Sequence, residues 1–347
     1  MSTIRNVPKF LCFFVSLGVL ILSIQSQGFA QEPVPRSMYM EYAQKAADHT
    51  WQNYDGVIER WKEGFDPESV FGYRPPGGLL EMAVIYAYLY EQGNNQEHAA
   101  RAKKILLTYA DYRSAYPEWA RKKRPDYEDG IPMLPDFFTV MRFLRAYDIL
   151  NKGGVLKAEE NQRIQENIAD SMRYVLRTQE WGPMNRTALR AESLAWAVRA
   201  MPGHPDAQKW EMQRKALGDD NWGNWQIEDA TIYHGVWLYA LLGYADAMGK
   251  LDELLDTPEM YYYAHYFLHL MCPAGMIPDF GDANWMANWP RFLVYFEAAA
   301  SHYGDPHLKW AASTIARKFI DFSEPKNIGL AYNFLDCYLW GSDEIPA

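Results

Sequence analysis

The feature that most constrains this fold is a repeated alternation of apolar and polar helical segments joined by short turns. Residues 79–90 are apolar on nearly every side, Gly93-Asn94-Asn95 forms a turn, and residues 96–115 are more polar. A helix that is apolar all round must be buried, whereas a polar one lies nearer to solvent. The sequence therefore predicts an inner helix followed by an outer helix.

The same unit recurs along the chain. Gly203-His204-Pro205 opens the pattern G-x-P-x-x-x-K-W, and Gly304-Asp305-Pro306 opens the similar, one residue shorter pattern G-x-P-x-x-K-W, each with the proline in the first turn of an outer helix. Repeated helix–turn–helix units bury their faces against their neighbours, and no segment alternates with the period of a β-strand. We therefore predict an all-α fold, an α/α toroid (an incomplete barrel) of about five to seven helical hairpins, with an open α-solenoid as the alternative. The expected helices are 38–62, 79–90, 96–115, 137–150, 158–178, 187–200, 206–217, 232–248, 258–271, 290–303, 306–322 and 328–338.

Long joints lead from several outer helices into the next inner helix. In either arrangement we expect these joints at one end of the molecule, and a site there, because functional residues concentrate on connections held by a rigid scaffold. One joint carries Arg121-Lys122-Lys123-Arg124, which is either a solvated surface or the rim of a cleft for an anionic ligand.

The start of the chain has the pattern of a secretory signal peptide. A basic beginning precedes an apolar run from Phe10 to Ile24, and Gly28-Phe29-Ala30 has the small residues of a cleavage site. A membrane anchor is the alternative, but the apolar run is short for one. We predict residues 1–30 as the signal peptide, residues 31–347 as one catalytic domain, and a periplasmic or secreted location with no membrane association after cleavage.

The overall charge bears on the choice of partner. The chain has 34 Lys and Arg against 44 Asp and Glu, a formal net charge of −10. An acidic surface argues against nucleic acid and anionic membranes as partners. Any polyanionic ligand therefore needs a locally basic cleft.

No metal and no cofactor are predicted. His265 and His269 have the i, i+4 spacing of two ligands on a helix, but no carboxylate stands at an accompanying spacing, so a core pair is favoured. Cys272 and Cys337 either form one disulfide, which export would permit, or remain buried thiols.

Several aromatic residues lie in joints rich in Gly, Pro or Asn rather than in helical runs. Flat rings beside polar groups suit the faces of sugars, although core packing is the default for any one of them. On this ground the candidate substrate-binding aromatic residues are Tyr73, Trp181, Trp225 and Trp285.

Two stretches place polar groups at the start of apolar helical runs. Gly182-Pro183-Met184 leads into Asn185 and Arg186. Asn185 standing alone would be interpreted as an N-cap. Arg186 and Arg190, one turn apart, would be interpreted as ordinary partners of nearby carboxylates such as Glu192 or Asp206.

The second stretch, Glu228 to His234, opens the run that contains Tyr233 and His234. Asp229 is the expected N-cap of this helix. Trp237 and Tyr244 share a helical stripe and are expected in the core, whereas the first-turn pair Tyr233 and His234 is a candidate for function.

A third polar joint runs from Pro278 to Trp285 and is followed by Arg291. Asp279 and Asp282 in this joint form a catalytic pair, bind a cation, or cap a helix and hold arginine side chains. All three interpretations stay open at the level of sequence.

These groups together suit β-elimination from a uronic acid. Donors such as Asn, Arg or protonated His, aimed at the carboxylate, stabilise the enolate-like charge that develops when the C5 proton leaves. A Tyr or His removes that proton and returns one to the departing O4. The phenol, whose pKa is about 10, needs a neighbouring Arg or imidazolium to favour phenolate. The residues that supply these parts are Asn185, Arg186, Tyr233, His234 and Arg291.

The same two stretches resemble segments of the α/α-toroid polysaccharide lyases, the group of alginate, glucuronan, chondroitin and heparinase II/III-like enzymes. Trp181 to Arg186 is similar to the segment in which these lyases carry an Asn or Asn-His that neutralises the uronate, although Arg186 stands where several have His. Asp229 to Leu238 is similar to their helix start, where a Tyr serves as base and acid. The large C-terminal β-sheet domain of many heparinase-like members has no counterpart here, so a compact single-domain type is expected.

The resemblance implies a lyase that cleaves an anionic, uronic-acid-containing polysaccharide. Taking the residues and the resemblance together, the candidate catalytic residues are Asn185, Tyr233, His234 and Arg291, and the candidate substrate-binding residues are Arg186, Trp181, Trp225, Tyr73, Asp279 and Trp285.

Two other functions fit the same pattern. An inverting glycoside hydrolase on the same toroid would use two carboxylates about 6.5–9.5 Å apart across a cleft. The carboxylates available for such a pair are Asp126, Asp229, Asp279 and Asp282. A non-catalytic periplasmic glycan-binding protein is the third possibility.

Overall fold

The computed structural model describes residues 32–63, 78–115, 134–176, 180–282 and 284–346. These residues form fourteen helices joined by turns and loops, with no β-strand among them, so the described chain is all-α as predicted. None of these helices is both long and apolar enough to cross a membrane. The predictions for the signal peptide, Tyr73, Asp126 and the basic run Arg121-Lys122-Lys123-Arg124 concern positions outside the described residues.

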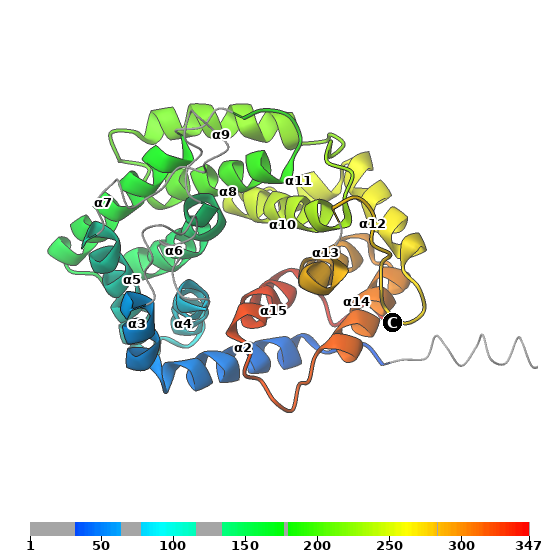
Figure 1. Cartoon of the computed structure of the whole chain (residues 1–347), viewed down its shortest axis with the longest axis horizontal. Coiled ribbons are helices and arrows are strands. Elements are labelled where there is room, and N and C mark those ends of the chain that lie inside the picture. The colour runs from blue at the N-terminus through cyan, green and yellow to red at the C-terminus, as the bar shows by residue number, and fades with distance from the viewer. Residues whose placement is uncertain (1–31, 64–77, 116–133, 177–179, 283, 347) are drawn as a thin grey trace, which may run out of the picture.

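Six helices surround the centre of the molecule (Figure 1). They are α4 (Leu79–Gly93), α6 (Leu134–Lys152), α8 (Asn185–Ala200), α10 (Thr231–Ala247), α13 (Trp285–Tyr303) and α15 (Ile328–Trp340). Each packs against the next one in this order, and α15 packs against α4. The six inner helices therefore follow one another without a break.

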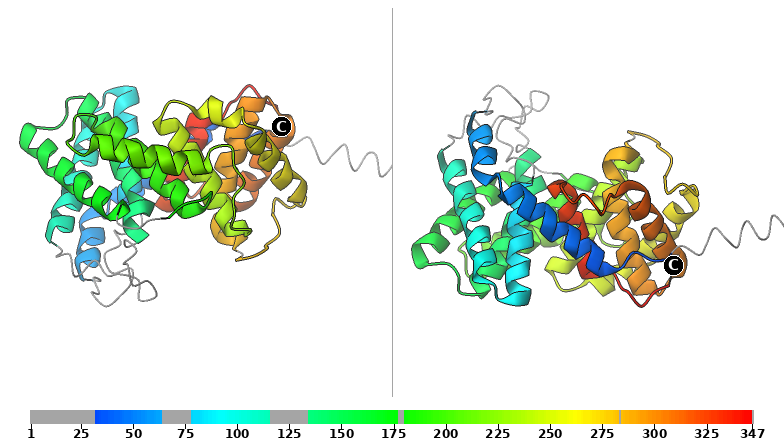
Figure 2. Two further views of the ribbon diagram at one scale, coloured as in Figure 1. Left: turned by 90° about the horizontal axis from the view of Figure 1, so that it is seen from above. Right: turned by 90° about the horizontal axis from the view of Figure 1, so that it is seen from below.

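The remaining helices lie outside these six (Figures 1 and 2). They are α2 (Arg36–Trp51), α3 (Tyr54–Glu63), α5 (Gln96–Ala115), α7 (Ala158–Val175), α9 (Ala207–Asn221), α11 (Leu251–Leu255), α12 (Pro258–Leu270) and α14 (Pro306–Phe319). Helix α5 packs on α4, α9 on α8, α14 on α13, and the N-terminal α2 on the C-terminal α15. Inner and outer helices thus alternate along most of the chain.

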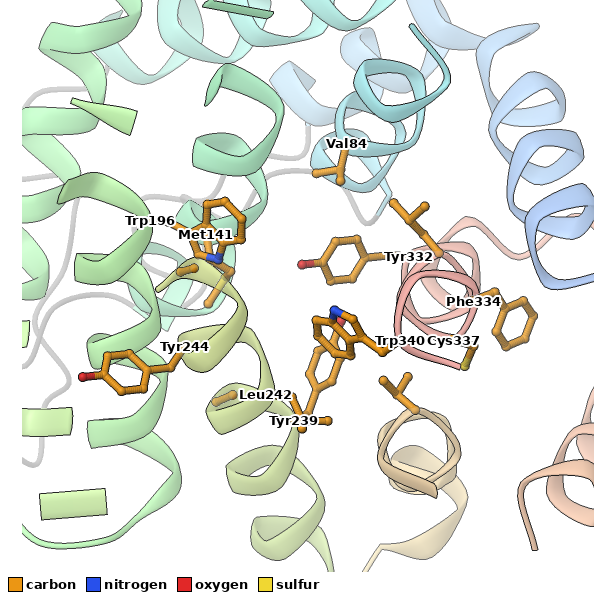
Figure 3. Packing of buried hydrophobic residues seen from close by; sticks show 14 of the residues in the cluster. Val84, Met141, Trp196, Tyr239, Leu242, Tyr244, Tyr332, Phe334, Cys337 and Trp340 are labelled. Atoms are coloured by element: carbon orange, nitrogen blue, oxygen red, sulfur yellow. The ribbon is translucent and has the colours of Figure 1, made fainter. Parts of the chain in front are cut away.

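The burial of side chains explains this division. Helix α10 is apolar on all sides, and its buried residues include Trp237 and Tyr244, as predicted. Outer helix α9 buries only a few residues, among them Trp210. In the centre, Tyr239, Trp340 and Tyr332 lie between the inner helices (Figure 3). The apolar helices are inside because only there can every face be covered.

Some helix boundaries differ from the prediction. The expected helix 38–62 is two helices, α2 and α3, with an interruption at Gln52 and Asn53. Helix α13 begins at Trp285 rather than at Pro290, because the Asn284 side chain accepts a hydrogen bond from the Ala287 N–H (3.2 Å) and caps the earlier turn.

The two copies of the repeated pattern also differ. Pro306 is the first residue of α14, where Asp305 accepts hydrogen bonds from the next turn, whereas Pro205 precedes α9. The short helix α11 was not predicted. Cys272 is exposed, Cys337 is buried, and both are free thiols.

Candidate functional site

Three of the joints that lead into inner helices contact one another. The Ile227 N–H donates a hydrogen bond to the Pro183 carbonyl (2.9 Å), so the joint before α10 packs on the turn before α8. The Thr231 N–H donates to the Phe280 carbonyl (3.0 Å), so the start of α10 also packs on the joint before α13. The three polar stretches that the sequence singled out therefore lie together.

A buried amide holds two of these elements in place. Asn221, the last residue of α9, donates from Nδ2 to Thr187 Oγ1 (3.0 Å) and accepts from Trp237 Nε1 (2.7 Å). Thr187 Oγ1 in turn donates to the Gly182 carbonyl (2.7 Å). Helices α8, α9 and α10 are thus connected through one side chain. No sequence signal marks Asn221, because a single Asn at a helix end is usually a cap.

Asn185 is the first residue of α8 and not its N-cap, which is Met184. Its backbone N–H donates to Glu228 Oε2 (3.4 Å), which brings it against the joint before α10. The residue is only 4% exposed. Asn185 therefore lies within the cluster of joints but offers little surface to a ligand.

Arg186 and Arg190 share a carboxylate that the sequence analysis did not select. Arg186 forms an ion pair with Glu180 Oε1, and Arg190 Nη1 lies 3.1 Å from Glu180 Oε2. Burial lowers the pKa of the Arg190 guanidinium to about 10. The expected partners, Glu192 and Asp206, are replaced by Glu180, which precedes α8 by only a few residues.

Tyr233 lies in the first turn of α10 and is partly exposed. Its hydroxyl donates a hydrogen bond to Asp282 Oδ2 (3.1 Å), and Asp282 belongs to the joint before α13. The sequence predicted a cation beside this phenol, whereas this partner is a carboxylate. Tyr233 and Asp282 are therefore a pair between which a proton can move.

His234 faces away from the surface that Tyr233 reaches. It is 5% exposed and packs among the rings of Tyr263, Phe267 and Phe280. Its Nε2 lies 3.5 Å from Asp229 Oδ1. Burial lowers the pKa of the imidazole, despite the opposing effect of Asp229, so the neutral form is favoured. The prediction of His234 as a protonated group on the substrate does not fit this position.

Arg291 lies in the second turn of α13. Its Nη1 donates to Asn288 Oδ1 (2.5 Å). Asn288 Nδ2 donates to the carbonyls of Thr231 (3.1 Å) and Ile232 (2.5 Å), at the start of α10. Arg291 is thus linked to the backbone beside Tyr233 through one amide.

The predicted substrate-binding aromatic residues divide into two groups. Trp181 is 74% exposed and Trp225 is 50% exposed, so both have faces that a ligand can reach. Trp285 is 1% exposed and packs against Phe292 and Phe319. Trp285 is therefore a core residue, and its assignment as a substrate contact was wrong.

Carboxylates are numerous in the cluster. Burial, together with the charges of Glu180 and Asp282, raises the pKa of Glu228, to which no role was assigned from sequence. Asp279 Oδ1 accepts from the Trp285 N–H (2.7 Å) and so holds the start of α13. Asp229 is not the N-cap of α10, since that position is Ala230. The sequence feature that could have identified Glu228 as a candidate is its position just before α10, the helix that carries Tyr233.

The described residues contain no group of three or more His, Cys, Asp or Glu side chains arranged to hold a metal ion. His265 hydrogen-bonds instead with the Tyr261 carbonyl (2.9 Å) and with Asp305 Oδ2 (3.0 Å). This ring connects α12 to the cap of α14.

The geometry at the joints combines an amide, a guanidinium, a phenol paired with a carboxylate, a second carboxylate and two exposed indole rings. Comparison of the chain with protein-family models gives no match, and comparison with curated proteins gives none either.

Proposed function

We propose that this protein is a polysaccharide lyase that cleaves a uronic-acid-containing polysaccharide by β-elimination on an α/α toroid of six helical hairpins. The order of packing supports the toroid, because each inner helix contacts the next and α15 contacts α4. The N-terminal sequence pattern supports export to the periplasm or beyond. The observation that carries the reaction is the hydrogen bond from the Tyr233 hydroxyl to Asp282.

That hydrogen bond suggests how a neutral phenol can act as the base. The Tyr233 oxygen accepts the C5 proton of the uronate while its own proton passes to the Asp282 carboxylate. The C5–H electron pair forms the C4=C5 double bond, and the C4–O4 bond breaks. The departing O4 then takes a proton back from the Tyr233–Asp282 pair, which restores the starting state. Positioned proton transfer of this kind contributes about 10²–10⁴-fold to the rate.

The negative charge that develops on the uronate needs donors nearby. Asn185, whose backbone N–H donates to Glu228, and Arg186, which is paired with Glu180, lie at the start of α8. Arg291 is linked to the start of α10 through Asn288. Fixed donors aimed at an oxyanion stabilise it without reorganisation during the reaction. The exposed rings of Trp181 and Trp225 are suited to bind sugar faces on either side.

The test is to incubate the purified protein with alginate, glucuronan, hyaluronan, chondroitin and ulvan and to follow near-ultraviolet absorbance from the C4=C5 bond. We expect activity on at least one polymer. Tyr233→Phe and Asp282→Asn each remove one member of the proton relay, so each should lower kcat by about 10²-fold or more.

Tyr261→Phe is the matched control. Tyr261 is 52% exposed on the outer helix α12, so loss of its hydroxyl should leave the rate unchanged. Full activity in both Tyr233→Phe and Asp282→Asn would refute this assignment of the relay. Absence of an unsaturated product from every polymer would refute the lyase.

A second candidate, an inverting glycoside hydrolase, is favoured by one observation. The raised pKa of Glu228 makes it a possible general acid, and the charge of Asp282 contributes to that shift. A hydrolase would release saturated sugars from the same panel, with activity lost in Glu228→Gln. Binding of a polymer without any product would instead indicate a glycan-binding protein.

A further inference from the structure

Two arginines on different inner helices lie near each other and near the central residue Tyr239. Arg142 is on α6, which packs between α4 and α8, and Arg291 is on α13, which packs between α10 and α15. In the order of inner helices α6 and α13 are three steps apart in either direction, so they face each other across the centre (Figure 1). Both side chains are partly exposed, which means that solvent reaches them.

We propose that Arg142 and Arg291 together bind a carboxylate group of the ligand in the centre of the six inner helices. The identity of that ligand as a sugar acid rests on the proposed function, but the anion site does not.

Neither arginine has its donors filled by the protein. Arg291 donates to Asn288 Oδ1 (2.5 Å), and no carboxylate among the described residues forms an ion pair with it. Arg142 donates to the Phe138 carbonyl (2.8 Å), and its Nε lies 3.5 Å from Glu81 Oε1. A guanidinium has several further N–H groups in a planar fork that matches a carboxylate.

The charges near the two arginines do not balance. Glu81 is the one carboxylate in ion-pair distance of Arg142 among the described residues. Burial raises the pKa of the nearby Glu192 to about 8, so this side chain is largely neutral at pH 7. Burial and the Arg142 cation lower the pKa of Arg291 to about 10, which leaves it charged. Two cations and one anion in a partly desolvated space favour the binding of another anion.

The walls of the site are fixed by their own contacts. Arg142 Cζ lies 4.8 Å from the centre of the Tyr332 ring. The Tyr332 hydroxyl accepts from Arg145 Nη1 (2.7 Å), and the Tyr239 hydroxyl donates to Asp336 Oδ2 (2.5 Å). Both tyrosines lie toward the centre in Figure 3. The Tyr332 ring, held by Arg145, therefore positions the Arg142 guanidinium, and Asn288 positions that of Arg291, before any ligand arrives.

Hydrogen bonds connect the proposed anion site to the backbone next to Tyr233. Arg291 is bonded to Asn288, which donates to the carbonyl of Ile232, the residue before Tyr233. A carboxylate held by Arg291 therefore lies on the inner side of the proposed reaction centre. Arg142 would be a specificity-determining residue that selects an acidic sugar over a neutral one.

The experiment measures binding of sodium D-glucuronate by isothermal titration calorimetry at low salt, with D-glucose as the neutral probe. We expect saturable binding of glucuronate, none of glucose, and at least tenfold weaker glucuronate binding in Arg142→Gln and in Arg291→Gln. Arg173→Gln is the control, because Arg173 is 72% exposed on the outer helix α7. It should bind glucuronate as the unaltered protein does.

A thermal melt without ligand separates binding from a structural role. Arg291→Gln removes one of two repelling cations, so we expect an unchanged or higher melting temperature, whereas Arg142→Gln also leaves Glu81 without its ion pair, so we expect a lower melting temperature. If either variant melts at a lower temperature, its glucuronate affinity is measured at a temperature at which circular dichroism shows the helices intact. That affinity then decides whether the arginine binds the ligand. Unchanged affinity in both variants, or no glucuronate binding by the unaltered protein, would overturn the proposal.

The two proposals fail separately. Glucuronate binding that depends on Arg142, without any unsaturated product from the polymers, would leave the anion site and remove the lyase. Elimination activity with KM and glucuronate affinity unaffected by Arg142→Gln would leave the lyase and remove the anion site.

Discussion

Glu192 on α8 is a buried carboxyl group that should make stability depend on pH. Burial raises its folded-state pKa to about 8, whereas the unfolded chain has an ordinary value near 4.3. Between these two values the folded state holds a proton that the unfolded state has lost. The free energy of unfolding therefore falls as pH rises through this window, by up to about 1.4 kcal/mol per pH unit from this group.

We predict that Glu192→Gln removes this contribution. The variant should lose less stability than the unaltered protein between pH 5 and pH 8, as measured by urea unfolding at each pH. The difference between the two proteins isolates Glu192 from other titrating groups. Parallel stability curves across the window would contradict the assignment.

At this scale the sequence predicted which polar groups stand at helix starts, but not which way each one faces. Tyr233 and His234 are adjacent, and consecutive residues on a helix point about 100° apart. One of them therefore reaches the joints while the other is buried among aromatic rings. Trp285 was misassigned for a related reason, because a tryptophan in a polar joint and one in the first buried turn of a helix have the same local sequence.

At the scale of whole helices, glycines allow neighbouring helices to approach one another closely. A Cβ built on Gly243 of α10 would lie 2.2 Å from Glu192 Oε1 on α8. A Cβ built on Gly218 of α9 would lie 1.9 Å from the Tyr244 hydroxyl oxygen. A side chain at either position would force the Glu192 or the Tyr244 side chain out of its packed position.

We predict that Gly243→Ala lowers the free energy of unfolding by about 1–3 kcal/mol, because the overpacking exceeds the gain in helix propensity. Gly93→Ala is the control, since nothing lies within 4 Å of a Cβ at the end of α4. It should change stability by less than about 1 kcal/mol, in the stabilising direction. Urea unfolding compares the two, and equal effects would contradict the packing argument.

Elements with strong local signals were predicted well. Helix α5 has the predicted bounds, Gln96–Ala115, because a turn precedes it and its polarity differs from that of α4. The start of α13 was misplaced because a proline usually marks the first turn of a helix. Here the Asn284 cap and the buried Trp285 and Trp289 let the helix begin N-terminal to Pro290. A tertiary contact decides such a boundary, and it is not visible in the local sequence.

Across the whole molecule, the packing of the first described helix on the last one has no sequence signature. Helix α2 buries Tyr39 and Tyr42 against α15, and the Tyr39 hydroxyl donates to Glu297 Oε1 (2.9 Å). Burying each aromatic side chain contributes about 1.5–3 kcal/mol. Without α2, one side of α15 would be exposed to water.

We therefore predict that a chain lacking residues 1–51 does not unfold cooperatively, as judged by far-ultraviolet circular dichroism on heating. A chain lacking only residues 1–31 keeps α2 and should melt as the full chain does. Equal melting of both would show that α2 contributes little to the fold.

The first and last described segments lie side by side, where the Arg36 N–H donates to Asp343 Oδ1 (2.8 Å) and the start of α2 lies close to the C-terminus (Figures 1 and 2). A short peptide linker from Pro346 to Glu32 would therefore span little space. New termini cut at the exposed turn Gly93-Asn94-Asn95 would give a circular permutant in which every helix keeps its neighbours while the order of synthesis changes.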